Sequence, residues 1–206
     1  MTPENDFYFI GNDIKTKKAC FRKVLSDELL HSLPIFVCLI FRFMEIRKTK
    51  PEEIHILMDI FALAKAFMKK SGNLNQWNDG YPSRELIMQN IQKEFSYVCM
   101  DDDHEIVATF YFEIGIDPNY AKIYDGEWLN DEPYGVIHRM ASTGKVKGIS
   151  DYCLQWCFDQ CKNIRIDTHR DNLTMQNAVR RNGYTYCGII HLQNGAERLA
   201  FQKHEK

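Results

Sequence analysis

Hydrophobic and polar positions alternate between residues 163 and 168, near the C-terminal end of the chain. Ile164 and Ile166 fall on one side of this alternation, and Arg165 and Asp167 fall on the other. A period of two residues is typical of a β-strand whose two faces meet different surroundings. The pattern therefore predicts a strand here.

A short helix is predicted directly after this strand. Asp171 or Asn172 can accept a hydrogen bond from the free amides of a first helical turn, so the helix should begin there. Gly183 can adopt the left-handed conformation at which helices commonly end. Three apolar residues between these limits share one helical face: Met175, Ala178 and Val179.

The rest of the chain continues the alternation of strands and helices. Residues 184–192 and 198–203 have strand-like patterns, and Asn194-Gly195 between them is a strong hairpin signal. The upstream elements are a strand from Met44, helices over 51–68 and after Ser83, a hairpin over 97–112, a strand over 134–141 and a helix over 150–161. This order predicts a mixed α/β fold with a sheet of about seven strands flanked by helices.

The last of these upstream helices carries a row of cysteines. Cys153, Cys157 and Cys161 recur every four residues and so share one helical face. A metal or redox site is one interpretation. We favour core packing, because buried free cysteine behaves as a small hydrophobe and structural zinc needs tetrahedral ligands presented from loops. The 7 cysteines follow no disulfide-like spacing, which predicts a reducing cytoplasm and no bound metal.

Charge and hydropathy exclude several classes of protein. A net charge of -2 and a pI near 6.4 disfavour a nucleic-acid binder, which needs a basic face. The longest apolar run, over 33–41, is interrupted by Pro34 and is about half the length of a membrane span. No cleavage site of a signal peptide follows it, so we predict neither a membrane span nor export.

Residues 1–43 differ from the remainder of the chain. They combine clustered basic residues with the apolar run and lack a clear periodicity. Two interpretations stay open: translation begins at Met44, or residues 1–43 form an arm that packs on the domain or on a second subunit. The main domain is predicted to span residues 44–206.

Two separated sets of motifs, in the expected order, resemble one known family. The first set is Gln76-Trp77 and Gly80-Tyr81-Pro82, and the second is Asp167-Thr168-His169, Asn172, Met175-Gln176, Asn182-Gly183-Tyr184 and Cys187-Gly188. Over about residues 44–203 the chain is similar to the GNAT superfamily of acyl-CoA-dependent N-acetyltransferases, and to a bacterial subgroup with the Gln-Trp and Gly-Tyr-Pro segment. The resemblance implies a mixed sheet with splayed central strands.

The resemblance also implies a site for acetyl-CoA as co-substrate. The loop Gly144–Ser150 is similar to the family's pyrophosphate-binding signature, with lysine and serine replacing two of its usual residues. Main-chain amides at a helix N-terminus suit such a phosphate. The implied cofactor-binding residues are Lys145, Val146, Lys147, Gly148, Ile149 and Ser150 in this loop, Met140, Ala141 and Ser142 on the preceding strand, and His169 and Asn172.

Acyl transfer to an amine needs one proton removed from the ammonium and one delivered to the thiolate. The tyrosine that many family members use as the acid is replaced by Val179, so another group or solvent must act. His138 is the preferred base or water relay because imidazole exchanges protons near neutral pH. Glu113 and Tyr186 are further catalytic candidates, although a structural hydrogen bond explains each of them equally well.

The acceptor site is expected from two loops with aromatic and acidic residues. Its candidate residues are Gln76, Trp77, Tyr81, Glu127 and Trp128. Carboxylates would attract a cationic amine, whereas acidic loops are often only solvated and a tryptophan can equally fill the core. We therefore expect an N-acetyltransferase, monomeric or homodimeric, that acts on a small-molecule or peptidyl amine in a ternary complex. A non-catalytic acyl-CoA-binding module is the alternative, favoured by Val179.

Overall fold

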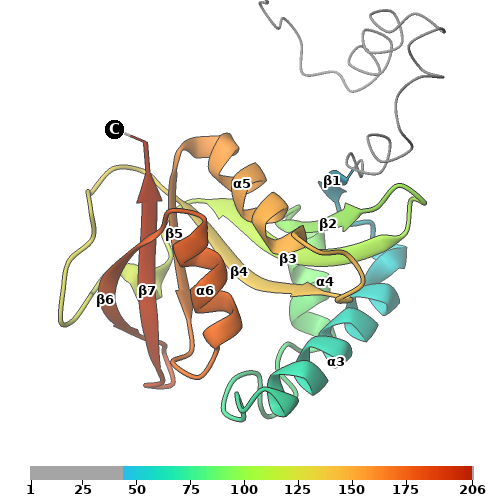
Figure 1. The fold of residues 1–206 in the computed structure, drawn as a ribbon, viewed down its shortest axis with the longest axis horizontal. Helices are drawn as coiled ribbons and strands as arrows, with labels where there is room; N and C mark the ends of the chain where they lie inside the picture. The colour runs from blue at the N-terminus through green and yellow to red at the C-terminus, as the bar shows by residue number, and fades with distance from the viewer. Residues whose placement is uncertain (1–43, 206) are drawn as a thin grey trace, which may run out of the picture. The chain divides into compact units, whose positions relative to one another are not determined.

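The computed structural model describes residues 44–205 (Figure 1). The proposed arm or alternative start over residues 1–43, and the apolar run within it, lie outside the described residues. In the part that is described, no helix has the length and apolar character that crossing a membrane requires.

One mixed seven-stranded sheet runs through the domain, in the order β1-β2-β3-β4-β5-β7-β6. Its strands are β1 (Glu45–Lys48), β2 (Ser96–Met100), β3 (Ile106–Ile114), β4 (Gly135–Ser142), β5 (Asn163–Thr168), β6 (Thr185–His191) and β7 (Glu197–His204). The pairing of β4 with β5 is parallel, and the other neighbouring pairs are antiparallel. The predicted mixed α/β sheet flanked by helices is therefore confirmed.

Helices cover both faces of the sheet (Figure 1). They are α3 (Ile54–Lys70), α4 (Arg84–Gln92), α5 (Ile149–Cys161) and α6 (Leu173–Arg181), with short 3-10 turns η1 (Pro51–Glu53) and η2 (Pro118–Tyr120). Residues of α5 and α6 share one core with the sheet, while residues of α3 and α4 form a second core on the opposite face. Neighbouring strand residues take opposite sides: Cys99 belongs to the first core and Val98 to the second.

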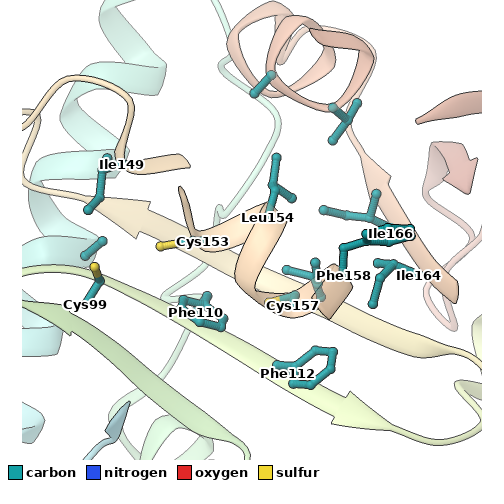
Figure 2. Packing of buried hydrophobic residues seen from close by; sticks show 14 of the residues in the cluster. Cys99, Phe110, Phe112, Ile149, Cys153, Leu154, Cys157, Phe158, Ile164 and Ile166 are labelled. Atoms are coloured by element: carbon teal, nitrogen blue, oxygen red, sulfur yellow. The ribbon is translucent and has the colours of Figure 1, made fainter. Parts of the chain in front are cut away.

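Two cysteines of the α5 row, Cys153 and Cys157, lie in the first core (Figure 2). The side chains of Cys153 and Cys157 are fully buried among residues such as Phe110 and Leu154, and Cys161 is partly exposed. Burial raises the pKa of the Cys157 thiol well above its ordinary value. Within residues 44–205 no group of cysteine, histidine and carboxylate side chains could hold a metal ion. The preferred interpretation of Cys153 and Cys157 as core residues is confirmed.

A core role for Cys157 predicts a difference between two small substitutions. Cys157→Ser should lower the free energy of unfolding by about 1–3 kcal/mol, because it buries a hydroxyl in an apolar core. Cys157→Ala should cost less, since it leaves no unpaired polar atom. Urea unfolding of both variants measures this. Equal stability of the serine variant and the wild type would contradict the core assignment.

Candidate active site

A cleft opens where β4 and β5 part. The two strands pair only from Gly135 to Ile137 on β4 and from Ile164 to Ile166 on β5. Beyond that point a cavity of about 1180 Å³ is lined by the C-terminal half of α3, residues 75–81, β4, the start of α6 and the turn between β6 and β7. The divergence leaves one edge of β4 without a strand partner inside the cleft.

A β-bulge shapes β4 at the point of divergence. Arg139 has a positive φ of 51°, and the register with β3 shifts between Thr109 and Tyr111. Because the amide of Thr143 donates to the carbonyl of Val107 on β3, the alternation of an antiparallel pair directs the main-chain groups of Ser142 away from β3. Main-chain donors and acceptors of β4 therefore face the open side.

The loop from β4 to α5 leaves the N-terminus of the helix accessible. Gly148 is the N-cap of α5, with a φ of 76° and no side-chain cap. A Cβ placed on it would meet no atom within 4 Å. Val146 and Ile149 are buried and anchor the loop, while Lys145 and Lys147 are exposed. Uncapped amides and the helix dipole make this end of α5 suitable for a phosphate group.

His138 lies in the cleft between two carboxylates. Its Nε2 is 2.7 Å from Oδ2 of Asp117, and its Nδ1 is 3.6 Å from Oδ1 of Asp167. The hydroxyl of Tyr120 donates to the same Asp167 oxygen at 2.8 Å. Tyr111 lies beside the imidazole, with the two ring centres 5.7 Å apart. The histidine ring is thus held in place by polar contacts at both of its nitrogen atoms.

No protein-family model matches the sequence, and no curated protein matches it. A crystal structure of a GNAT-family acetyltransferase from Streptococcus agalactiae is 34% identical, covers 79% of this chain and 96% of its own, and has a TM-score of 0.73. This chain belongs to the GNAT family of acetyltransferases.

More distant structures agree with this GNAT fold. A GNAT-family acetyltransferase from Listeria monocytogenes is 16% identical, with 80% of this chain and 100% of that chain covered and a TM-score of 0.59. A protein from Salmonella typhimurium, solved with its cofactor acetyl-CoA, is 12% identical, with 78% and 93% covered and a TM-score of 0.54. At these identities the likeness concerns the fold.

The predicted acceptor loop and the predicted cofactor asparagine of this GNAT domain are in direct contact. The side-chain nitrogen Nδ2 of Asn172 donates a hydrogen bond to Oε1 of Gln76 at 2.9 Å. Oδ1 of Asn172 accepts one from the main-chain amide of Met175 at 3.1 Å. Asn172, and not Asp171, is therefore the N-cap of α6. Oε1 of Gln76 also accepts a hydrogen bond from the side-chain amide of Asn73 at 2.7 Å.

The GNAT cleft gathers about half of the predicted site residues. Those that line it are Gln76, Trp77, Tyr81, His138, Met140, Ala141, Ser142, Ser150 and Asn172. The residues that do not line it are Glu113, Glu127, Trp128, Lys145, Val146, Lys147, Gly148, Ile149, His169 and Tyr186. Among these, the loop residues from Lys145 to Ile149 still surround the accessible end of α5.

Five of the predicted residues lie outside both the cleft lining and the loop before α5. Trp128 packs on Tyr120 with ring centres 5.3 Å apart, is partly buried against a small core cluster and does not line the cleft. Tyr186 packs edge-on against Phe201, with ring centres 5.7 Å apart, and does not line the cleft. The carboxylate of Glu113 accepts a hydrogen bond from the hydroxyl of Tyr111.

Glu127 and His169 complete this set. Glu127 is exposed on the loop after β3 and lies outside the cleft lining. Nδ1 of His169 accepts from the amide of Asp171 at 3.2 Å, so this side chain stabilises the turn before α6. Burial and the positive charge of Arg198 lower the pKa of His169. The roles of Glu127 in acceptor binding and of His169 in cofactor binding stay predictions.

Sequence patterns did not single out Asp117. It precedes Pro118 and caps η2 by accepting from the amide of Asn119 at 2.8 Å, so the sequence indicates only a turn. Asp117 contacts His138, which is 21 positions away in the sequence. Burial alone would raise the pKa of Asp117, but the hydrogen bond with His138, its charge and the bonds from Asn119 together lower it below the ordinary value.

The lowered pKa predicts how Asp117 affects stability. A carboxyl group whose pKa falls on folding stabilises the folded state above its unfolded pKa, about 4, and this contribution is lost as the pH falls through the folded pKa. Urea unfolding should therefore find Asp117→Asn less stable than the wild type at pH 7, and the gap should narrow below about pH 4. A gap that stays constant with pH would contradict the ionic contact.

Proposed function

We propose that this GNAT protein transfers an acetyl group from acetyl-CoA to an amine by direct attack in a ternary complex. The observation that carries the proposal is the position of His138, between Asp117 and Asp167, in the cleft where β4 and β5 diverge. The family membership supports acetyl transfer in general. An imidazole can accept the proton that an acceptor ammonium must lose before it attacks.

The chain offers matching groups for the parts of acetyl-CoA. Amides from Val146 to Ser150, at the uncapped end of α5, suit the pyrophosphate, and Gly148 leaves the approach open. Main-chain groups of Met140 and Ser142 suit the pantetheine arm, because β4 has no partner on that side. When bound, acetyl-CoA supplies the thioester carbonyl that makes the acetyl group transferable. An amide of β4 beside that carbonyl would stabilise negative charge on its oxygen.

His138 acts as the base in this proposal. If Nε2–H donates to Asp117, the lone pair of Nδ1 is free to accept a proton from the acceptor ammonium. Asp167, 3.6 Å from Nδ1, stabilises the imidazolium that results. Asp117 is a positioning residue because it fixes the ring and its tautomer. The histidine then releases the proton to water.

The acid step has no tyrosine at the position seen in many family members. Val179 lies on α6 and is fully buried in the core, and its neighbour Ala178 lines the cleft instead. Neither side chain can donate a proton. We assign protonation of the thiolate to water in the cleft.

The acceptor side is assigned to Gln76, Trp77 and Tyr81. All three line the cleft, and Trp77 packs on Tyr81 with ring centres 6.5 Å apart. We further propose that residues 44–206 form the catalytic domain, of the bacterial subgroup with the Gln-Trp and Gly-Tyr-Pro segment. The described cysteines carry free thiols, which favours a reducing cytoplasm.

The buried Val179 also favours a second candidate, a GNAT domain that binds acyl-CoA without transferring the acyl group. Release of CoA thiol, measured with acetyl-CoA over a panel of amines, separates the two candidates. Amine-dependent release supports the enzyme. Calorimetric binding of CoA without release with any amine would support the binding module, and absence of both would overturn both candidates.

A further inference from the structure

The cleft contains a cation that the proposed transfer reaction does not use. Arg139 lines the cleft on the bulge of β4, directly after His138. Within residues 44–205 the guanidinium has no carboxylate partner within ion-pair distance, whereas the other arginine of the cleft, Arg198, lies 3.9 Å from Asp167. A charge left unneutralised in a cleft is a candidate for binding an anionic group.

The contacts of Arg139 hold it in place without neutralising it. Its guanidinium lies over the ring of Tyr111, with 4.7 Å from Cζ to the ring centre, and Nη1 donates to the hydroxyl of Tyr81 at 3.0 Å. Nη2 makes no hydrogen bond to the described residues. A guanidinium that is already oriented loses little conformational freedom when it binds a carboxylate.

One aromatic ring connects this cation to the proposed base. The imidazole of His138 lies 5.7 Å from the centre of the Tyr111 ring, and the guanidinium of Arg139 lies 4.7 Å from the same centre. The bulge causes this proximity, because consecutive residues of a regular strand point to opposite faces. The imidazole and the guanidinium therefore both lie beside this one ring in the cleft.

We infer that the acceptor is a small amine with a carboxylate a few bonds from its amino group, an amino-acid-like molecule whose carboxylate is bound by Arg139. This inference rests on the proposed acetyl transfer and names the substrate class of the same cleft. The amine faces His138 and its two carboxylates, while the carboxylate faces the guanidinium. The opposite charges of the two subsites fix the direction in which the acceptor binds.

Matched acceptor pairs test this inference. Each pair consists of an amino acid and the corresponding amine that lacks the carboxylate, such as phenylalanine and phenethylamine, with a broader set of side chains in parallel. In any pair that the wild type acetylates, kcat/KM should be larger for the amino acid than for the amine that lacks the carboxylate. Arg139→Gln should lower the ratio of the two kcat/KM values by about 10- to 100-fold, the equivalent of one charge-assisted hydrogen bond, mainly through KM.

Two further variants separate charge from structure. Arg139→Lys, which keeps the charge, should retain part of the ratio, and Arg198→Gln should leave the ratio unchanged. An equal loss for both members of a pair in Arg139→Gln, or a wild-type preference for the amine without a carboxylate, would overturn the inference. Wild-type protein that binds CoA but acetylates no carboxylate-bearing acceptor would also overturn it while CoA binding stands. Absence of CoA binding would overturn the proposed function itself.

Discussion

Replacing His138 with glutamine should lower kcat by roughly 100- to 10,000-fold, the usual contribution of a general base. Glutamine keeps a hydrogen-bonding side chain of similar length beside Asp117, but it cannot accept a proton from the ammonium. The KM for acetyl-CoA should change little, because the main-chain groups assigned to the cofactor lie elsewhere in the cleft. Steady-state kinetics over a range of pH measures both quantities. The limb of the pH–rate profile that reports deprotonation of the base should be lost.

Two variants serve as controls for this result. His204→Gln removes a histidine near the end of β7, outside the cleft lining, and should leave kcat within about threefold of the wild type. Asp117→Asn should lower kcat less than His138→Gln, because it disturbs the ring without removing it. A His138→Gln variant with wild-type kcat and pH profile would remove the histidine from the mechanism.

The second large effect is expected at Gly148. Replacing it with valine should raise the Kd for CoA by about 10- to 100-fold, as expected when a charge-assisted hydrogen bond worth about 1.5–3 kcal/mol is lost. The backbone there has a φ of 76°, which a β-branched residue adopts only with strain, and the new side chain would occupy open space at the end of α5. Isothermal titration with CoA measures the change.

Backbone strain alone must be separated from loss of the phosphate site. Gly72 offers a matched control because its φ is 86°, a Cβ there also meets no atom within 4 Å, and it lies outside the cleft lining. Gly72→Val should lose a similar amount of stability, about 1–2 kcal/mol, and keep its affinity for CoA. Unchanged affinity in Gly148→Val, or an equal loss in both variants, would contradict the assignment of the pyrophosphate to this loop.

Local patterns were sufficient to predict most of the sheet. The alternation over 163–168 corresponds to β5, and the hairpin predicted over 97–112 corresponds to β2 and β3. The sequence offers Asp171 or Asn172 as the cap of the following helix, and in the structure Asn172 accepts the hydrogen bond from Met175. These elements are predictable because caps, turns and side-chain periods depend on residues close in sequence.

The candidate site was less accessible from sequence because its contacts join distant segments. His138 and Asp117 are 21 residues apart, and Asn172 and Gln76 are 96 residues apart, so no spacing rule connects them. Trp128 shows the converse difficulty: an indole in a polar loop suits a ligand site and a core position equally well, and only the structure shows that it packs on Tyr120. The bulge at Arg139 depends on strand register, which single residues do not reveal.

A crystal structure of the complex with CoA would test the central claim most directly. We expect pyrophosphate oxygens within hydrogen-bond distance of the amides from Val146 to Ser150, and the thiol end of CoA between β4 and β5, beside His138. Binding of CoA at another surface, or with its thiol end away from this histidine, would contradict it.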